Sequence, residues 1–556
     1  MLNASRYFHT LRYLRPVQIY GRLWYKLYHP IPDLSPPPTI RPLSGIWRDP
    51  ARKSPSLIGP QRFRFLNVEH DILSAPDWNH PDWAKLWLYN LHYFDDLTAV
   101  NAADRIDWHR SLIMRWVAEN PPGKGNGWEP YPLSLRIANW IKWALAGNEM
   151  PPAALESLAV QARYLTRRME YHLLGNHLFA NAKALVFAGL FFDGVEAGRW
   201  LNMGTGILFA ELEEQILTDG GHFERSPMYH SIVLEDVIDL VNLLRVAGEG
   251  DGDLSIRLTA KVSPMLSWLK TMLHPDGEIS FFNDTALRIA QAYRDLLAYA
   301  GRIGIVGGAE MNVTSSRLAR QSGFARLEAG PFVVLADVGS IGPDYQPAHA
   351  HAETLSFELS IGGKRCLVNS GISCYEESAE RLRQRSTAAH NCLAVDGADS
   401  SEIWRSHRVG KRARVQTVTL RAGDRDSTLS ASHDGYLQLR GVGLCRREWD
   451  VRSDRLLIRD RVEGTGMHSI AIYLHINPDW RISKTVGIDF LLTYDNLSIQ
   501  LTTPEQMEFT IETSTISPEF GISIPSQTVI GKCYTALPVL FETKISPLPQ
   551  RNAATV

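Results

Sequence analysis

Long hydrophobic runs are missing from this chain of 556 residues, and charged residues interrupt each apolar stretch near its start. Residues 1–9 contain no uninterrupted apolar core, and Arg12, Arg15 and Lys26 divide the segment that follows. A secretory signal or a transmembrane helix needs such a core. We therefore expect no stable membrane insertion and a cytoplasmic location, with the periplasm as the alternative.

Cysteine and net charge are also scarce. The five cysteines form no close pair and cannot all pair internally, so a disulfide framework is not indicated. A formal net charge of −2 provides no broad attraction to nucleic acid or to an anionic membrane. The 15 Trp and 19 Tyr would suit stacking against sugar rings, although aromatic residues are more often simply core.

The apolar pattern divides the chain into three parts. Residues 1–56 are predicted to form a helix and a Pro-rich connector. The helix, over 13–28, is expected to pack on its own domain, with a membrane or partner surface as the alternative. Residues 57–315 carry apolar residues at helical spacing from about Trp78 to Gly301, which predicts an all-α array. Residues 316–556 contain short β-rich runs, which predict a sandwich or barrel and hence an α+β multidomain protein.

Three histidines precede apolar runs in the β-rich part. His349 and His351 stand two residues apart before the alternating run 355–359, so both rings are expected on one side of the backbone. His390 precedes the run 392–395. Imidazole is a metal ligand or a proton acceptor near neutral pH, so the pattern predicts one of these sites. The alternative is surface histidines at a strand start.

Two segments of the helical part carry polar groups that suit acid–base chemistry. Asn176 and His177 follow a glycine, where Asn176 is either an N-cap or, with His177, a hydrogen-bond donor to a ligand carboxylate. Tyr229 opens a predicted helix close to Arg225, which would stabilise a phenolate and permit proton exchange. The alternative for Tyr229 is an aromatic anchor at a helix end.

Segments 87–97 and 128–136 mix aromatic and polar side chains as a sugar-binding groove would, although helix packing produces the same pattern. We add to them the polar neighbours of Tyr229. The predicted substrate-binding residues are Tyr89, His92, Trp128, Tyr131, Arg136, Glu224, Arg225 and His230.

In this order, the segments 175–177, 226–230, 349–357 and 386–391 resemble the heparinase II/III-like polysaccharide lyases, whose relatives include alginate lyases. The resemblance spans roughly residues 85–410. It implies an N-terminal (α/α) toroid of helical hairpins, a C-terminal antiparallel β-sandwich and a cleft between them. It also implies cleavage of a uronic-acid-containing polysaccharide by β-elimination.

The resemblance further implies a role for each matching residue. Asn176 and His177 would offset the uronate carboxylate while the proton at C5 is removed. Tyr229 would serve as acid and, depending on stereochemistry, as base. His349 would be the other proton acceptor.

Some members of this family hold zinc through two histidines and an aspartate, and His351 and His390 match the two histidines. Asn369 stands where the aspartate is expected, and an amide is a poor zinc ligand. We therefore expect no cofactor, with zinc as the alternative and Glu353 as the nearby acid that could substitute. Without metal, His351 is expected to hydrogen-bond to Asn369 or to a neighbouring backbone group.

The function predicted from these residues is that of an enzyme, a polysaccharide lyase acting on an acidic polysaccharide or oligosaccharide in a bacterial capsule, exopolysaccharide or O-antigen pathway. One alternative is a protein that binds an acidic glycan without cleaving it. Another is a glycoside hydrolase that uses Glu224 and Glu353, which would need two acids facing one bond. The oligomeric state is not indicated.

Overall fold

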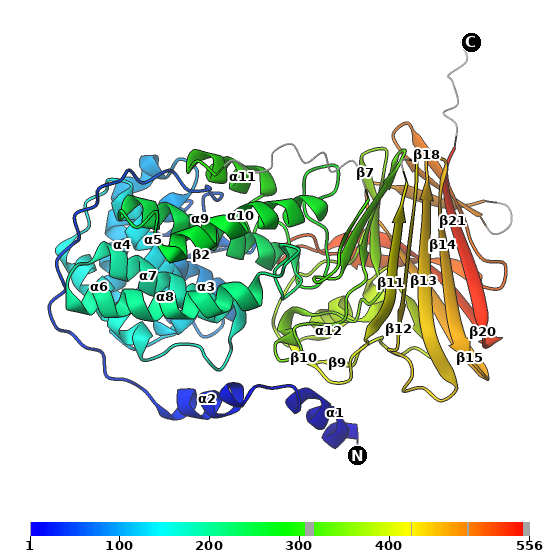
Figure 1. The fold of residues 1–556 in the computed structure, drawn as a ribbon, viewed down its shortest axis with the longest axis horizontal. Coiled ribbons are helices and arrows are strands. Elements are labelled where there is room, and N and C mark those ends of the chain that lie inside the picture. Colours follow the sequence, from blue (N-terminus) through cyan, green and yellow to red (C-terminus); the bar gives the residue numbers. More distant parts are fainter. Residues whose placement is uncertain (1, 306–315, 424, 486–488, 549–556) are drawn as a thin grey trace, which may run out of the picture.

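The computed structural model describes residues 2–305, 316–423, 425–485 and 489–548, in which a helical half precedes a β-sheet half (Figure 1). This confirms the predicted order of helices and strands. The predicted domain boundary at residue 315 lies outside the described residues. No described helix has both the length and the apolar content needed to cross a membrane.

The helical half is a set of antiparallel hairpins around a buried inner layer. Helices α3, α5, α7 and α9 contact one another in succession, while α8 and α10 pack against α7 and α9. Almost every residue of α7 and α9 is buried, which is expected of helices enclosed by others. The helices are α3 (Lys85–Tyr93), α4 (Ile106–Glu119), α5 (Pro130–Leu145), α6 (Pro152–Thr166), α7 (Gly175–Phe191), α8 (Val195–Gln215), α9 (Pro227–Val246), α10 (Asp253–Thr271) and α11 (Tyr293–Arg302).

The β half contains two large antiparallel sheets in the described residues. The first has the order β19-β20-β15-β7-β6-β5-β4-β3, with β8 beside β15. Its strands are β3 (Arg317–Ala319), β4 (Phe324–Ala329), β5 (Phe332–Asp337), β6 (Phe357–Ile361), β7 (Lys364–Leu367), β8 (Leu393–Val395), β15 (Met467–Ile476), β19 (Glu508–Ile516) and β20 (Ile524–Ala536).

The second sheet has the order β11-β12-β13-β14-β21-β18-β17-β16. Phe332 and Leu359 of the first sheet share one buried cluster with Trp449, Ile458 and Phe541 of the second, so the sheets form a sandwich. The strands are β11 (Val415–Ala422), β12 (Asp426–His433), β13 (Val442–Arg452), β14 (Arg455–Gly464), β16 (Arg481–Lys484), β17 (Asp489–Tyr494), β18 (Leu497–Thr502) and β21 (Val539–Pro547).

Buried polar side chains join the two halves. The His274 ring, just after α10, contacts the Glu358 carboxylate at 2.7 Å and the Ser360 hydroxyl at 2.7 Å, both on β6. Arg326 on β4 donates to the carbonyl of Leu273 at 2.5 Å. Because buried polar groups are stable only when they are hydrogen-bonded, these contacts hold the sandwich against the helices.

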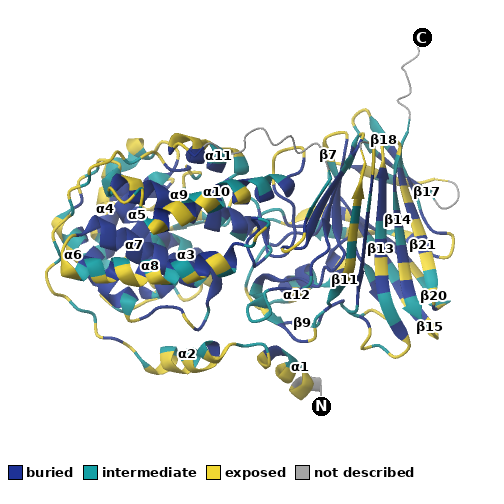
Figure 2. Cartoon of the chain, in the orientation of Figure 1, coloured by how far each residue is buried: buried dark blue, intermediate teal, exposed yellow. Residues whose placement is uncertain are grey.

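Several small elements differ from the sequence prediction. A hairpin of β1 (Arg62–Phe65) and β2 (Val68–Asp71) precedes the helices, and α12 (Ala379–Arg385) lies within the β half. A short ribbon of β9 (Ile403–Trp404) and β10 (Arg408–Val409) stands beside it. The helix predicted over 13–28 corresponds to α2 (Pro16–Leu27), which begins at Pro16, and a second helix that was not predicted, α1 (Leu2–Leu11), precedes it. Both helices lie along one edge of the molecule and are largely exposed (Figure 2).

Candidate active site

Tyr229 and His349 meet where the helical half faces the β half. Tyr229 lies in the first turn of α9, whose N-cap Ser226 accepts a hydrogen bond from the Tyr229 backbone N–H at 3.2 Å. His349 lies in the short helical turn Pro347–His349, on the connection between β5 and β6. The two rings stack with centroids 3.9 Å apart. The structure thus brings together two residues that the sequence places 120 positions apart.

Asp284 holds this pair in place. Its backbone carbonyl accepts a hydrogen bond from the Ser226 hydroxyl at 2.6 Å, and its backbone N–H donates to the His349 carbonyl at 3.0 Å. Its carboxylate accepts from His349 Nδ1 at 2.9 Å and from Arg381 Nη2 at 2.7 Å. Burial alone would raise the pKa of Asp284, but Arg381 and the neighbouring histidines hold it well below its usual range. His349 is therefore oriented by a buried, ionised carboxylate.

Glu224 connects His349 to Asn176. Both oxygens of the buried Glu224 carboxylate accept hydrogen bonds from Asn176 Nδ2 at 3.0 Å, and one of them also accepts from the Asn176 backbone N–H. The Glu224 Oε2 atom also lies 3.4 Å from His349 Nε2. Gly175 is required here, because a Cβ at that position would lie 2.4 Å from a Glu224 oxygen. Glu224 therefore orients Asn176, lies beside His349 and is itself buried.

His177 lies beside a carboxylate that favours its protonated form. Its Nδ1 lies 3.1 Å from Glu170 Oε1, and its ring packs on Tyr131 with centroids 4.4 Å apart. Burial disfavours the imidazolium, but Glu170 and then Glu224 outweigh it and raise the pKa of His177. About a quarter of the side chain is exposed (28%), so part of the ring is open to solvent. Asn181 is a polar residue in the otherwise apolar helix α7. Its side-chain amide donates a hydrogen bond to the Glu170 carboxylate at 3.0 Å and so holds that carboxylate in place.

The Tyr229 hydroxyl lies 3.0 Å from the Tyr375 hydroxyl. Burial, followed by the effect of Tyr375, raises the pKa of Tyr229 well above its ordinary value. Tyr229 is therefore a neutral phenol near neutral pH, which makes it a proton donor. The stabilised phenolate expected from Arg225 is wrong, because the Arg225 guanidinium instead bonds to the Ser340 carbonyl across the boundary between the halves.

His351, His390 and Glu353 form a second, fully buried cluster beside the first. Their ligand atoms all lie within 4.8 Å of one another. His351 Nε2 bonds to the ionised Asp284 at 2.9 Å, and His390 Nδ1 donates to the Ser386 carbonyl at 2.7 Å. In neutral rings these two bonds place the single proton on His351 Nε2 and on His390 Nδ1. The remaining nitrogens, His351 Nδ1 and His390 Nε2, are then unprotonated and lie 3.1 Å apart. Glu353 Oε2 is 3.2 Å from His390 and has no hydrogen-bond partner in the described structure.

These lone pairs converge as the ligands of a metal do, with a carboxylate or carbonyl on the far nitrogen of each ring. The donor set fits a transition metal, and the acid in it is Glu353. The expected hydrogen bond from the His351 ring to Asn369 or to a neighbouring backbone group is wrong, because the ring bonds to the Asp284 carboxylate. The side-chain amide oxygen of Asn369 instead accepts hydrogen bonds from the Ser356 hydroxyl at 2.7 Å and from the Asn391 backbone N–H at 3.3 Å.

Four of the predicted substrate-binding residues lie in the protein core and are excluded from a sugar-binding surface by burial: His92, Trp128, Arg136 and His230. The fully buried Arg136 donates to the carbonyls of Gly127 and His92 and therefore supports the fold. The His230 ring is bonded to the Met265 carbonyl at 3.0 Å. Their aromatic and polar pattern reflects helix packing, which was the alternative interpretation.

The other four candidates have separate positions. Tyr131 contacts His177, and Tyr89 is hydrogen-bonded to Glu129; both are half-buried on the helical wall. Glu224 and Arg225 act on protein groups, as described above. Tyr131 is thus the predicted aromatic residue best placed to meet a ligand beside His177.

Sequence reasoning missed Asp284, Glu170, Tyr375 and Arg381. Each is brought to the site by tertiary structure and lies in a segment without a distinctive spacing. The one available signal was Asn181, whose poor helix propensity marks a polar contact within α7.

Comparison with known proteins agrees with this architecture. Residues 88–300 match the family model for the heparinase II/III N-terminus, and residues 311–539 match that for the heparinase II/III-like C-terminal region. The heparin-sulfate lyase of Pedobacter heparinus is 27% identical over 315 residues, which are 50% of this chain and 46% of that protein. FtsZ-localized protein C of Caulobacter vibrioides is 24% identical over 432 residues, which are 71% of this chain and 70% of that protein. The match to the lyase of Pedobacter heparinus spans less than half of that protein.

Solved structures share the fold at low identity. A crystal structure of heparinase III has a TM-score of 0.71 at 17% identity, covering 97% of this chain and 90% of that one. Heparan sulfate lyase HepC from Pedobacter heparinus has a TM-score of 0.59 at 18% identity, covering 96% and 88%. Both likenesses support the toroid and sandwich assignment. The two family models together cover most of the sequence, and the chain belongs to the heparinase II/III-like family.

Proposed function

We propose that this protein is a polysaccharide lyase that cleaves a uronic-acid-containing glycan by β-elimination. The observation that carries the proposal is the stacked pair of Tyr229 and His349, with Asn176 and His177 at the other end of the same network. This network then contains a proton donor, a proton acceptor and a histidine whose pKa is raised. A protein that only binds glycans has no need for a buried carboxylate behind its histidine.

The contacts of the four residues support different roles for Asn176 and His177. The Asn176 amide is already bonded to Glu224, so His177 is the group free to meet the uronate carboxylate. Neutralising that carboxylate lowers the cost of the enolate-like intermediate that follows loss of the C5 proton. Tyr229, as a neutral phenol, donates a proton to the departing oxygen, and His349, oriented by Asp284, accepts a proton.

The hydrolase alternative is less well supported. Glu224 and Glu353 are each only 1% exposed, and each faces protein groups. A glycosidase needs both carboxyl groups at the scissile bond. The name of FtsZ-localized protein C states no lyase activity. For this reason the experiment below also distinguishes a lyase from a protein that only binds glycans.

The test is incubation of the purified chain with acidic glycans, among them heparan sulfate and alginate. We expect growth of the ultraviolet absorbance of an unsaturated uronate with at least one of them. Reducing ends that increase without that absorbance would indicate a hydrolase, and glycan binding with neither signal would indicate a binding protein. The predicted capsule, exopolysaccharide or O-antigen pathway stays a prediction.

Substrate affinity should depend on pH through His177. Its folded-state pKa is raised above the ordinary 6.5, so the charge is complete below that value and is lost as pH rises through the raised pKa. We expect KM to rise over that window while Tyr229 stays neutral. In His177→Gln, KM should be about 10–100-fold higher and largely independent of pH, since a hydrogen bond to a charged group contributes about 1.5–3 kcal/mol. An unchanged pH profile in this variant would assign the titration elsewhere.

We also propose that His351, His390 and Glu353 hold a transition metal such as zinc. When bound, the metal would supply a structural link between the segments around residues 351 and 390. Protein purified without chelator should contain stoichiometric metal, and His390→Ala should lose both the metal and thermal stability. The competing state is a protonated Glu353, whose pKa burial raises well above the usual range. In that state the purified protein would be metal-free and insensitive to chelators.

A further inference from the structure

Helix α2 leaves an apolar face exposed to solvent. Its exposed large side chains recur at helical spacing and are 59 to 72% exposed: Ile19, Tyr20, Leu23, Trp24 and Leu27. A surface helix of a globular protein normally buries such a stripe. On α2 this stripe is exposed along the helix, and a contiguous exposed apolar patch of this kind marks an interaction surface.

The inward face of α2 fixes this orientation. Gln18 is buried and donates to the Tyr345 carbonyl at 3.0 Å. Tyr25 packs on His172 with ring centroids 4.3 Å apart, and the Arg168 guanidinium lies 3.5 Å from the Tyr25 ring centre. Polar and aromatic contacts therefore dock α2 on the helical half, and its stripe of large apolar side chains remains exposed.

Helix α1 repeats the arrangement. Thr10 is buried and donates to the Val409 carbonyl at 3.2 Å, while Tyr7, Phe8 and Leu11 are 45 to 61% exposed. The two helices follow one another along the same edge of the molecule (Figure 1). We call this edge, formed by the exposed side chains of α1 and α2, the apolar edge.

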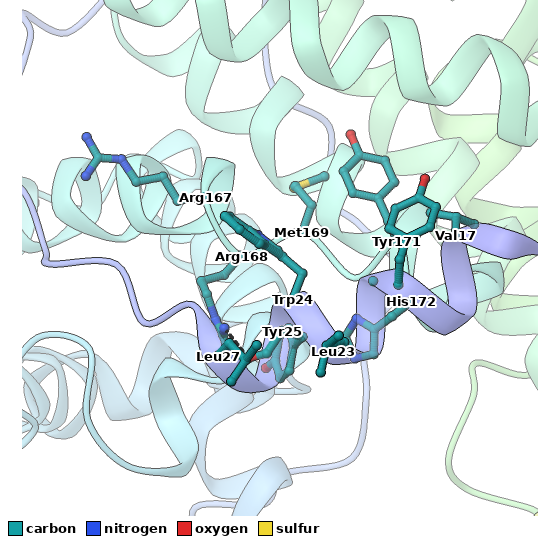
Figure 3. Close-up of a pocket in the computed structure, with 12 residues that line it drawn as sticks. Val17, Leu23, Trp24, Tyr25, Leu27, Arg167, Arg168, Met169, Tyr171 and His172 are labelled. Carbon is teal, nitrogen blue, oxygen red and sulfur yellow. Dashed lines mark hydrogen bonds between the residues drawn. The ribbon is translucent and has the colours of Figure 1, made fainter.

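A groove adjoins the apolar edge. It has a volume of about 690 Å³ and runs between α2 and residues 167–172 (Figure 3). Leu23, Trp24, Leu27 and Met169 line it, together with Arg167. The groove therefore combines an apolar surface with a cation at its margin.

Charge identifies the occupant. Residues 1–32 contain five basic residues and no acidic one, although the whole chain has a net charge of −2. Arg6 and Arg15 are paired with Glu402 and Glu214. Arg12, Arg22 and Lys26 make no ion pair with any described residue. The unpaired charges would attract an anionic surface, whereas a second copy of this edge would bring like charges together.

We propose that the apolar edge docks on the surface of an anionic phospholipid bilayer. Tryptophan, tyrosine and leucine on one helix face, flanked by arginine and lysine, are the composition of helices that lie in a membrane interface. The binding is peripheral, with α1 and α2 parallel to the bilayer. It is independent of the proposed lyase activity.

The test is sedimentation of the full chain with vesicles of phosphatidylglycerol or of phosphatidylcholine. We expect binding to phosphatidylglycerol that weakens as salt is raised, and much weaker binding to phosphatidylcholine. Leu23→Glu combined with Trp24→Glu should lower the affinity by about tenfold or more. These side chains are on the surface, so folding and glycan cleavage should be unchanged.

Tyr534→Glu provides the matched control, because Tyr534 is 70% exposed but lies on β20 in the sandwich. This variant should sediment like the parent. The proposal is overturned if the parent stays in the supernatant with phosphatidylglycerol at low salt. It is equally overturned if the α2 variant sediments like the parent, or if that variant changes only the oligomeric mass.

Discussion

Replacing Tyr229 with Phe is expected to lower kcat by about 10²–10⁴-fold, the usual contribution of a positioned acid or base. The variant loses one hydroxyl and its 3.0 Å hydrogen bond to Tyr375, so stability should fall by only about 1 kcal/mol. The stack on His349 uses the ring, which Phe retains. KM should therefore change little, and the measurement is steady-state kinetics on a cleaved glycan.

Tyr375→Phe is the control for this experiment. It removes the same hydrogen bond but leaves the Tyr229 phenol in place. We expect less than about a tenfold loss of kcat, since a single neutral hydrogen bond contributes about 1 kcal/mol. Equal losses in the two variants would mean that the bond, and not the Tyr229 proton, matters. Near-normal turnover in Tyr229→Phe would exclude it as the acid.

Replacing Asp284 with Ala should have the largest effect on stability, about 3–5 kcal/mol, as expected when one partner of a buried ion pair is removed. The fully buried Arg381 would lose its carboxylate, and His349 and His351 would both lose the group that orients them. Urea unfolding would measure the loss of stability. Turnover should also fall steeply, because His349 is then free to turn.

A second substitution separates the two effects. In the double variant Asp284→Ala with Arg381→Met, no buried charge is left unpaired, so much of the stability should return. Turnover should not return, because His349 still lacks its orienting carboxylate. Recovery of both quantities would show that Asp284 acts on stability alone and does not position His349.

The sequence predicted the architecture because burial makes periodicity visible. In helix α7, for example, apolar residues recur at helical spacing, as at Leu178, Ala182 and Leu185. The β1–β2 hairpin was missed because its strands have four residues each, and because its turn uses Leu66 at φ +54° beside Asn67 at +60°. Such a turn normally contains Gly or Asn at both positions, so Leu66 hides the signal.

The site was predictable only where the chain itself carries the chemistry. Asn176, His177, Tyr229 and His349 could be named as candidates because each stands in a segment that contributes to the family resemblance. Asp284 was not found, since its role depends on contacts with Ser226, His349 and Arg381 that only the folded chain creates. The buried aromatic and polar residues His92 and Arg136 misled for the opposite reason: their pattern was real, but it arises from packing.

The central claim is elimination, and a mass balance tests it most directly. A defined uronate-containing oligosaccharide would be cleaved in water labelled with heavy oxygen, and the fragments weighed by mass spectrometry. Elimination adds no water, so the fragment masses should sum to that of the substrate, with no label at the new ends. Fragments that together gain one water and carry the label would establish hydrolysis and contradict the account.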